Sequence, residues 1–408
     1  MLLCSTNSSL DTASSISNNT FKTLSEKADW DLHLKCLSSN PFHLSFSKSN
    51  NSSNKIPRIF HQTYKDLEIP AKYAYPLGSL GAHHNIGSRL SASGATSRGR
   101  EYEYVFWSDL SIMEFIASYY PDYVALFEGY THPLERADAI RYFIMYEFGG
   151  IYADLDMEFR RPLDSLIERG YSCILGEELP IQTKWLYDIN RSVFNALMLC
   201  APRHPFFRLV IDSLREFQQS VRSSRDTITF KTGPYFLQQV VARYMQADAQ
   251  RTLQCARDPL CRSDCLLLAA PQVFFPVVDS FSAQHLQNDC IYFLRQFVPT
   301  TTSATWMRAK RSPPPELVPT VDWCVWWFWN DFRLATIEES FTSHLYYHLG
   351  YQAFNGTTVH LGEFIPKVNV FTSGSGGRGR GTTGRDEGRP WSLVHSEQYT
   401  TKPKPSLL

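Results

Sequence analysis

The chain has 408 residues, which is enough for one large α/β domain or two smaller domains. Its 40 Lys and Arg residues balance 40 Asp and Glu residues, so the formal net charge is zero. A neutral chain lacks the basic excess of a general nucleic-acid-binding protein, and we therefore expect no nucleic-acid partner. Aromatic residues make up 14% of the chain, which indicates a large aromatic core and is compatible with stacking on a nucleotide or sugar.

The N-terminal residues 1–54 are rich in Ser, Asn and Thr, which predicts a disordered or stem-like segment. Apolar spacing within this segment allows a helix between about residues 25 and 37. Residues 1–4 do not form a signal peptide. The longest apolar stretch, residues 265–278, contains Gln272 and two prolines and is too short to cross a membrane. No membrane anchor is therefore visible in the sequence.

Residues 56–63, Ile-Pro-Arg-Ile-Phe-His-Gln-Thr, predict a first buried strand followed by a loop. His61, Gln62 and Thr63 lie where this strand ends, and ligands bind beyond the carboxyl ends of parallel strands. These side chains could therefore meet a nucleotide, although a core histidine with satisfied hydrogen bonds is the alternative for His61. Residues 75–101 are rich in Gly, Ser, Ala and Arg and predict a flexible insertion.

A second strand is predicted at residues 102–107 and a helix at residues 109–119. Ser108 or Asp109 is suited to cap this helix, because both side chains accept hydrogen bonds from free backbone N–H groups. Trp107, at the end of the strand, is placed where it could stack on a nucleotide base.

The most informative stretch is residues 134–156, which predict a helix, a glycine hinge and a short strand. The apolar stripe of the helix follows three-and-four spacing and comprises Ala137, Ile140, Ile144 and Phe148. Asp138 and Arg141 are neighbours on another face, which we expect to be exposed. Gly149-Gly150 ends the helix, because glycine adopts the left-handed conformation without penalty.

Residues 151–153 suit a buried strand that runs into Asp154 and Asp156. If the backbone stays extended, both carboxylates point to the same side. Such a pair is unfavourable unless a cation lies between them. The spacing alone is weak support, because Asp-Trp-Asp at residues 29–31 repeats it without other features of a site.

Downstream residues alternate between predicted strands and helices, which indicates an α/β fold. The strands are at residues 173–176 and 194–200, and the helices are at residues 204–219 and 234–247. We expect a C-terminal extension at residues 301–370 that completes an acceptor side, and a disordered tail at residues 371–408. Cys255, Cys261 and Cys265 fit no zinc signature and predict a disulfide-linked loop in an oxidising lumen.

Residues 136–156 closely resemble the sugar-binding region of the DXD glycosyltransferases. That family includes the fungal inositol-phosphoceramide mannosyltransferases, the yeast initiating α-1,6-mannosyltransferase and the animal α-1,4-galactosyltransferases. Residues 56–63 resemble the family's first strand and nucleotide loop, and residues 195–206 and 232–234 resemble its middle section. The resemblance covers residues 55–300 and is nearest to the inositol-phosphoceramide mannosyltransferase branch.

The resemblance implies an α/β, GT-A-like nucleotide-sugar-binding domain at residues 55–300, with a mainly parallel sheet flanked by helices. It also implies metal-dependent, retaining transfer of a hexose, with mannose favoured, to a glycolipid or glycan acceptor such as inositol phosphoceramide. GDP-mannose is the favoured donor, and a UDP-hexose remains open. Relatives in the family are Golgi membrane proteins, which implies membrane association on the lumenal side of the Golgi or another secretory compartment. The alternative is a catalytically degenerate sugar- or lipid-headgroup-binding protein with the same fold.

By motif position, Asp156 would bind Mn²⁺ or Mg²⁺ directly, and Asp154 would bridge the metal and the donor. Asp138 and Arg141 would hold the sugar or ribose. The remaining expected donor-binding residues are His61, Gln62, Thr63, Trp107, Gly150 and Asn195. The family also carries a C-terminal histidine that approaches the metal, for which His344 and His348 are both candidates and His348 is the one assigned. No residue is identified as a nucleophile.

Overall fold

The computed structural model describes eleven ranges and four further residues of the chain. The ranges are residues 34–36, 55–86, 101–169, 171–179, 191–220, 227–255, 266–278, 340–347, 356–365 and 368–372, with residues 182, 183, 187 and 189 and the strand at residues 392–395 in addition.

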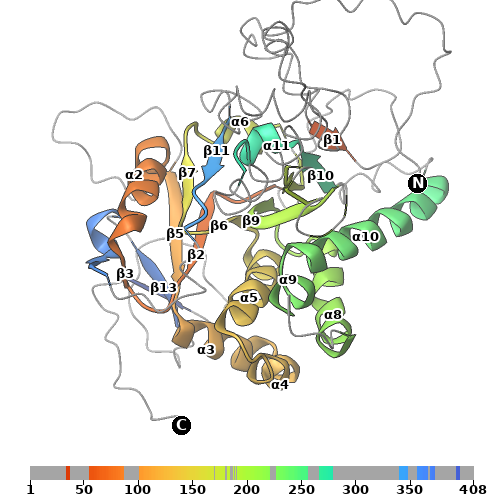
Figure 1. The fold of residues 1–408 in the computed structure, drawn as a ribbon, viewed down its shortest axis with the longest axis horizontal. Helices are drawn as coiled ribbons and strands as arrows, with labels where there is room; N and C mark the ends of the chain where they lie inside the picture. The colour runs from red at the N-terminus through yellow and green to blue at the C-terminus, as the bar shows by residue number, and fades with distance from the viewer. Residues whose placement is uncertain are drawn as a thin grey trace, which may run out of the picture.

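A ten-stranded mixed sheet forms the centre of the fold (Figure 1). In spatial order its strands are β1 (Leu34–Cys36), β10 (Leu266–Ala269), β8 (Cys173–Glu177), β9 (Val193–Cys200), β6 (Gly150–Ala153), β2 (Ile59–Thr63), β5 (Glu101–Trp107), β13 (Asn369–Thr372) and β14 (Ser392–His395), and β4 (Asn85–Ile86) also pairs with β5. The neighbours β6, β2, β5 and β13 are parallel, as are β10 and β8, whereas β9 runs antiparallel to both β8 and β6. The predicted α/β fold with a mainly parallel sheet is confirmed.

Helices cover both faces of the sheet (Figure 1). One face carries α3 (Asp109–Tyr119), α4 (Val124–Glu128), α5 (Pro133–Phe148), α8 (Pro205–Ser220), α9 (Thr227–Lys231) and α10 (Pro234–Cys255), and the other carries α2 (Ala74–His83), α6 (Asp164–Ile167) and α11 (Pro271–Phe274). Successive strand side chains point to opposite faces, so Ile151 packs into one hydrophobic cluster and Tyr152 into the other. The central strands are therefore buried at nearly every position, as expected for a sheet that is covered on both sides.

The helix α5 begins and ends as its sequence predicts. The His132 side chain accepts a hydrogen bond from the backbone N–H of Leu134, and Glu135 completes a capping box. Gly149 ends the helix with φ 62°, and a Cβ there would lie 2.4 Å from the nitrogen of Pro202. Gly150 has φ 90°, and its Cβ would lie 2.5 Å from the carbonyl oxygen of Ile59 in β2. Gly150 therefore allows the close approach of β6 to β2, and its expected donor contact stays a prediction.

Part of the expected flexible insertion is folded. Residues 74–83 form α2 and residues 85–86 form β4, because Pro76, Leu77 and Leu80 recur at helical spacing and are buried against the sheet. Gly78 of α2 lies on the exposed side of the helix, because a Cβ at this position would meet nothing within 4 Å. It therefore does not interrupt the buried stripe. Residues 87–100 lie outside the described part of the chain.

Both termini contribute strands to the sheet, contrary to the sequence expectations. Residues 34–36 form β1 rather than part of a helix, and they pair antiparallel with β10. The expected disordered tail includes the end of β13, where Phe371 is fully buried and stacks on Trp107 at 5.0 Å between ring centroids. The domain boundary expected near residue 300 therefore does not separate the sheet from the C-terminal segment.

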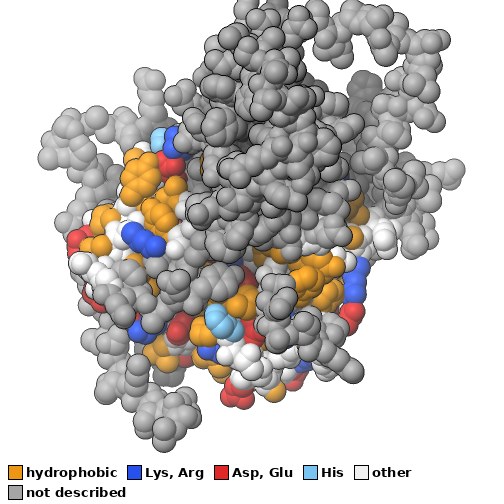
Figure 2. All heavy atoms as spheres, in the orientation of Figure 1, with side chains coloured by type: hydrophobic (Ala, Val, Ile, Leu, Met, Phe, Trp, Pro, Cys, Tyr) orange, Lys and Arg blue, Asp and Glu red, His pale blue; other side chains and the backbone are white. Residues whose placement is uncertain are grey.

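Two smaller strand pairings lie outside the central sheet. The strand β11 (Thr342–His344) pairs with β7 (Met157–Phe159), and β12 (Thr358–His360) pairs with β3 (Glu68–Pro70). The short helices η2 (Ala71–Tyr73) and η7 (Leu361–Glu363) follow β3 and β12, and η3 (Pro121–Tyr123) lies between α3 and α4. Acidic and basic side chains are interspersed on the face in Figure 2. Among the described residues, no helix is long and apolar enough to cross a membrane.

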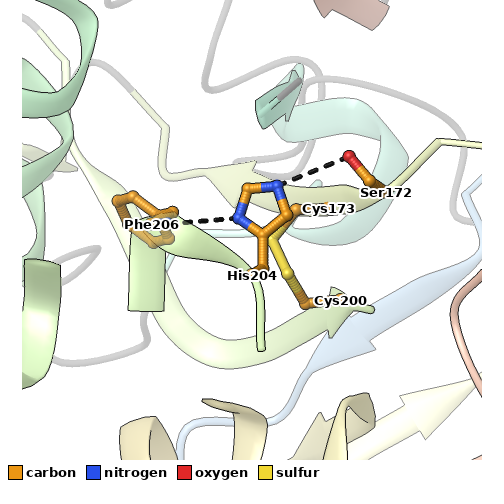
Figure 3. The surroundings of a disulfide bond; sticks show 5 residues. All are labelled: Ser172, Cys173, Cys200, His204 and Phe206. Atoms are coloured by element: carbon orange, nitrogen blue, oxygen red, sulfur yellow. Dashed lines mark hydrogen bonds between the residues drawn. A yellow bond between two sulfur atoms is a disulfide. The ribbon is translucent and has the colours of Figure 1, made fainter. Parts of the chain in front are cut away.

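A disulfide joins two neighbouring strands of the sheet. Cys173 in β8 and Cys200 in β9 are directly opposite each other, with their Cα atoms 4.0 Å apart. Figure 3 shows the buried His204 ring beside the bridge, with Nδ1 accepting from the backbone N–H of Phe206 at 3.2 Å. The disulfide predicted near Cys255 involves side chains outside those that the structure describes.

The disulfide is expected to stabilise the fold, because it closes a loop with a sequence separation of 27 residues. We expect Cys173→Ala to lower the free energy of unfolding by about 3–4 kcal/mol through the lost restraint on the unfolded chain. Denaturant unfolding of Cys173→Ala, Cys200→Ala and the double variant measures this. All three should lose a similar amount, because either substitution opens the same bridge, and losses below about 1 kcal/mol or simple addition in the double variant would contradict the bond.

Candidate active site

Asp154 and Asp156 lie on a tight turn between β6 and β7. The strand β6 ends at Ala153, and the backbone N–H of Met157 donates to the carbonyl of Asp154 at 3.1 Å. Leu155, between the two acids, is only 5% exposed and packs into the core. The backbone is thus not extended as the sequence analysis assumed, and the buried leucine anchors the turn that presents the two acids.

Asp154 is held by groups from three elements. Nη1 of Arg141 lies 3.2 Å from its Oδ1, and the hydroxyl of Tyr152 donates to the same oxygen at 3.0 Å. The side chain of Gln62 donates to its backbone carbonyl at 3.2 Å, while the hydroxyl of Thr63 lies 3.0 Å from that of Tyr152. Gln62 and Thr63 therefore act in this structure as supports of Asp154, at the carboxyl end of β2.

Asp156 is paired with a histidine from the C-terminal part of the chain. Because β11 pairs antiparallel with β7, His344 lies opposite Met157 and its Nε2 is 3.2 Å from Oδ1 of Asp156. The backbone N–H of Tyr347 donates to Oδ2 of Asp156 at 3.0 Å, across 191 residues of sequence. Of the two candidate histidines, His344 is therefore the one beside the carboxylates, whereas His348 lies outside the described residues.

The three side chains have the donor set of a hard divalent cation. One ligand atom from each of Asp154, Asp156 and His344 lies within 4.8 Å of the others. Carboxylate oxygens with one imidazole nitrogen suit Mn²⁺ or Mg²⁺. In the described part of the chain, the other group of this kind comprises Cys173, Cys200 and His204, whose sulfurs are joined in the disulfide.

The two carboxyl groups differ in their electrostatic surroundings. Burial raises the pKa of Asp154, the nearby charge of Asp156 raises it further, and Arg141 opposes both. Burial also acts against ionisation of Asp156, but the charge of His344 and the hydrogen bonds from His344 and Tyr347 outweigh it and lower the pKa of Asp156 to about 2. Asp154 is also the more accessible, with 27% of its side chain exposed against 11% for Asp156.

Asp138 and Arg141 form a buried pair, not the exposed pair expected from the helix pattern. Nη2 of Arg141 lies 2.9 Å from Oδ1 of Asp138, and Arg141 is 5% exposed. Nη1 of Arg141 also donates to the carbonyl of Asn195 at 2.9 Å, in addition to its contact with Asp154. Burial raises the pKa of Asp138 to about 6, against the opposing charge of Arg141. Arg141 thus connects the helix α5 to the acidic turn and to β9.

Tyr142 and Thr232 join the expected residue Asn195 in this network, and neither of the two was identified as a site residue from the sequence. Asn195 donates to Oδ1 of Asp138 at 2.9 Å and to the hydroxyl of Tyr142 at 3.2 Å. The hydroxyl of Tyr142 donates to the carbonyl of Thr232 at 2.6 Å, and the hydroxyl of Thr232 lies 3.4 Å from Oδ2 of Asp138. The Thr-Gly-Pro sequence at residues 232–234 predicted the start of a helix. It did not predict that Thr232 would contact Asp138 and Tyr142.

His61 and Trp107 are buried and bond to other parts of the protein. Nε2 of His61 donates to the carbonyl of Gly149 at 3.0 Å, so its Nδ1 accepts from Nε1 of Trp107 at 3.2 Å. Trp107 is 1% exposed and packs on Phe115 and Phe371. Base stacking by Trp107 does not fit this burial, and His61 corresponds to the core-histidine alternative. Both residues instead support the hinge between α5 and β6.

Comparisons with known proteins agree with this geometry. Residues 91–172 match the family described as glycosyltransferase sugar-binding region containing DXD motif. Inositol phosphoceramide mannosyltransferase 3 of Schizosaccharomyces pombe is 35% identical over 189 residues, which are 46% of this chain and 45% of that protein. A mannosyl phosphorylinositol ceramide synthase of Saccharomyces cerevisiae is likewise 35% identical, over 46% of this chain and 42% of its own length. The chain spans less than half the length of these two relatives.

Two further similarities are more distant. The initiation-specific α-1,6-mannosyltransferase of Saccharomyces cerevisiae is 27% identical over 30% of this chain and 24% of its own length. Among solved structures, the PaToxG glycosyltransferase aligns over 50% of this chain and 74% of its own, with 13% identity and a TM-score of 0.30, which is too low to establish a common fold. Residues 91–172 thus match the sugar-binding region described for DXD-motif glycosyltransferases. Over nearly half of its length the chain is similar to inositol phosphoceramide mannosyltransferases.

Proposed function

We propose that this chain is a metal-dependent glycosyltransferase that moves a hexose from a nucleotide-sugar donor to a glycolipid or glycan acceptor, with retention of anomeric configuration. The observation that carries the proposal is the grouping of Asp154, Asp156 and His344 within 4.8 Å at the end of β6. The names of the relatives favour mannose as the sugar and inositol phosphoceramide as an acceptor. GDP-mannose is the donor that we propose for this sugar.

Each side chain of the group has a distinct part in the proposal. A divalent cation, when bound, would stabilise the negative charge that develops on the diphosphate leaving group. Asp156 and His344, which are the more deeply buried, would hold the cation from the protein side. Asp154 is more accessible and is steered by Arg141 and Tyr152, so it would face both cation and donor.

The buried pair on α5 would contact the donor sugar. Oδ1 of Asp138 is occupied by Arg141 and Asn195, whereas Oδ2 has only the long contact of 3.4 Å with Thr232 among the described residues. That oxygen is therefore the acceptor atom left for a sugar hydroxyl. Arg141 fixes its position relative to Asp154, and this orientation is the contribution of the pair to catalysis.

A binding protein with a degenerate site is the second candidate, and one observation favours it. Asp154 is already paired with Arg141, and Asp156 lies 3.2 Å from Nε2 of His344, so both carboxylates already have partners within the protein. Donor turnover separates the candidates, because a protein that only binds would release no nucleoside diphosphate.

The compartment and membrane association are also part of the proposal. A buried disulfide between adjacent strands supports an oxidising compartment, such as the lumen of the Golgi or another secretory membrane system. An acceptor with a ceramide anchor would bring the reaction to the membrane surface.

The test uses the full purified chain with GDP-mannose or UDP-galactose, in Mn²⁺, Mg²⁺ or chelator, with and without inositol phosphoceramide in detergent. We expect GDP release that requires metal, rises with acceptor and yields a mannosylated lipid by mass spectrometry. Turnover of UDP-galactose instead would change the sugar but not the reaction class. If both nucleotides bind but neither is released from its sugar under any condition, the binding protein is the correct function.

A further inference from the structure

Three tyrosines from separate segments form a row of neighbouring rings that reaches the acidic turn. We call Tyr64, Tyr73 and Tyr347 the tyrosine rim. The ring centroid of Tyr73 lies 6.0 Å from that of Tyr64 and 5.8 Å from that of Tyr347. Nζ of Lys72 lies 4.8 Å from the ring centroid of Tyr347 and donates to its carbonyl at 3.2 Å. Figure 2 shows side chains of the hydrophobic class gathered over the region of α2, with a basic side chain beside them.

The tyrosine rim adjoins the carboxylates directly. The backbone N–H of Tyr347 donates to Oδ2 of Asp156 at 3.0 Å, so the rim and the acidic turn share a bond. Burial raises the pKa of Tyr73, and the charges of Asp156 and Asp154 raise it further. The phenol of Tyr73 is therefore protonated throughout the physiological range, and it lies within the electrostatic field of both acids.

The hydroxyl of Tyr73 is a hydrogen-bond donor without a partner among the described residues. Tyr73 is only 7% exposed. Its hydroxyl is nevertheless accessible, whereas the hydroxyl of Tyr130 is fully buried and also lacks a partner. The hydroxyls of Tyr104, Tyr142 and Tyr152, by contrast, all bond inside the protein. The hydroxyl of Tyr73 is therefore a donor near the candidate metal site that a ligand with acceptor atoms could use.

We propose that Tyr73 and Lys72 form a phosphate-binding subsite beside the acidic turn, next to Tyr347. The tyrosine hydroxyl and the lysine ammonium would both donate to phosphate oxygens of a substrate. This inference rests on the proposed function, in which the phosphate belongs either to the diphosphate of the donor or to the phosphodiester of an inositol-phosphate acceptor. Both groups offer only acceptor atoms, which matches a phenol and an ammonium that act as donors.

The experiment compares Tyr73→Phe and Lys72→Met with Tyr123→Phe in the full chain. Tyr123 is 8% exposed and donates to Asp212 on the helical face, so it matches Tyr73 in burial but lies away from the rim. Isothermal titration calorimetry measures GDP in Mn²⁺ and, separately, inositol 1-phosphate in chelator. Transfer assays measure the KM for acceptor, and thermal melts confirm that each variant is folded.

We expect Tyr73→Phe and Lys72→Met each to weaken binding of one phosphate probe by about tenfold, with Tyr123→Phe unchanged. Weaker GDP binding identifies the donor diphosphate, whereas weaker inositol 1-phosphate binding and a raised acceptor KM identify the acceptor. Wild-type affinity for both probes in both variants would overturn the subsite, even if transfer activity is intact. If wild-type chain neither transfers sugar nor binds GDP, the proposed function fails, and binding of inositol 1-phosphate alone then decides the subsite.

Discussion

Asp154→Asn and Asp156→Asn are each expected to reduce metal-dependent sugar transfer by about 100- to 1000-fold. The ligand atoms of Asp154, Asp156 and His344 lie within 4.8 Å of one another, so losing one carboxylate charge removes a third of the candidate ligand set. A bound metal supplies several kcal/mol of charge stabilisation in the transition state, and each 1.36 kcal/mol corresponds to about tenfold in rate. Donor turnover against Mn²⁺ concentration measures the loss.

The chain provides a matched control for these variants. Asp29 and Asp31 have the same spacing but lie outside the described residues, and we expect Asp29→Asn and Asp31→Asn to keep wild-type turnover. Full activity in both Asp154→Asn and Asp156→Asn would show that the acidic turn is not catalytic.

The two acids should differ in their effects on stability without metal. The pKa of Asp156 is lowered to about 2, so its charge stabilises the folded state above the ordinary carboxyl pKa and this contribution disappears as the pH falls toward 2. Asp156→Asn should therefore lower the melting temperature in chelator at pH 7. The pKa of Asp154 is raised, so burying its charge costs stability, and Asp154→Asn should be the milder substitution.

Arg141→Met is expected to lower the free energy of unfolding by about 3–5 kcal/mol and to abolish transfer. Arg141 is 5% exposed and bonds to Asp138 at 2.9 Å and to Asp154 at 3.2 Å. Removing one partner of a buried ion pair leaves the other charge without compensation, which is strongly destabilising. Denaturant unfolding at pH 7 measures this.

An exposed ion pair supplies the control for Arg141→Met. Arg243 pairs with Glu216, and their side chains are 43% and 59% exposed, so Arg243→Met should cost only about 0–1 kcal/mol. Adding Asp138→Asn to Arg141→Met should restore part of the lost stability, because it removes one stranded buried carboxylate. Equal losses in Arg141→Met and Arg243→Met, without rescue, would refute the buried network.

The fold around α5 could be predicted because it depends on local sequence. The helix, the glycine hinge, the strand β6 and the helix at residues 109–119 follow from periodicity, capping residues and glycine conformations that act over a few positions. Ser108 caps α3 by accepting from the backbone N–H of Ser111 at 3.2 Å, as one of the two capping candidates. Such features need no knowledge of distant contacts.

The remainder of the site depends on contacts that local patterns do not encode. Periodicity alone gave no reason to prefer His344 over His348, because the pairing of β11 with β7 is set by tertiary packing. Asp138 looked exposed because acids on helices usually are, whereas Asn195 and Arg141 compensate its burial here. The burial of Phe371 against Trp107 was not predicted, because Phe371 begins a Gly- and Arg-rich tail whose composition predicted disorder.

The central claim is that Asp154, Asp156 and His344 bind one divalent cation. Electron paramagnetic resonance of free Mn²⁺, titrated into the full chain with GDP present, measures this binding directly. We predict one Mn²⁺ per chain in the wild type and in Asp29→Asn, and at least tenfold weaker binding in Asp156→Asn and in His344→Ala. Stoichiometric binding of the same affinity in all four proteins would contradict the claim, because the ion would then be held elsewhere.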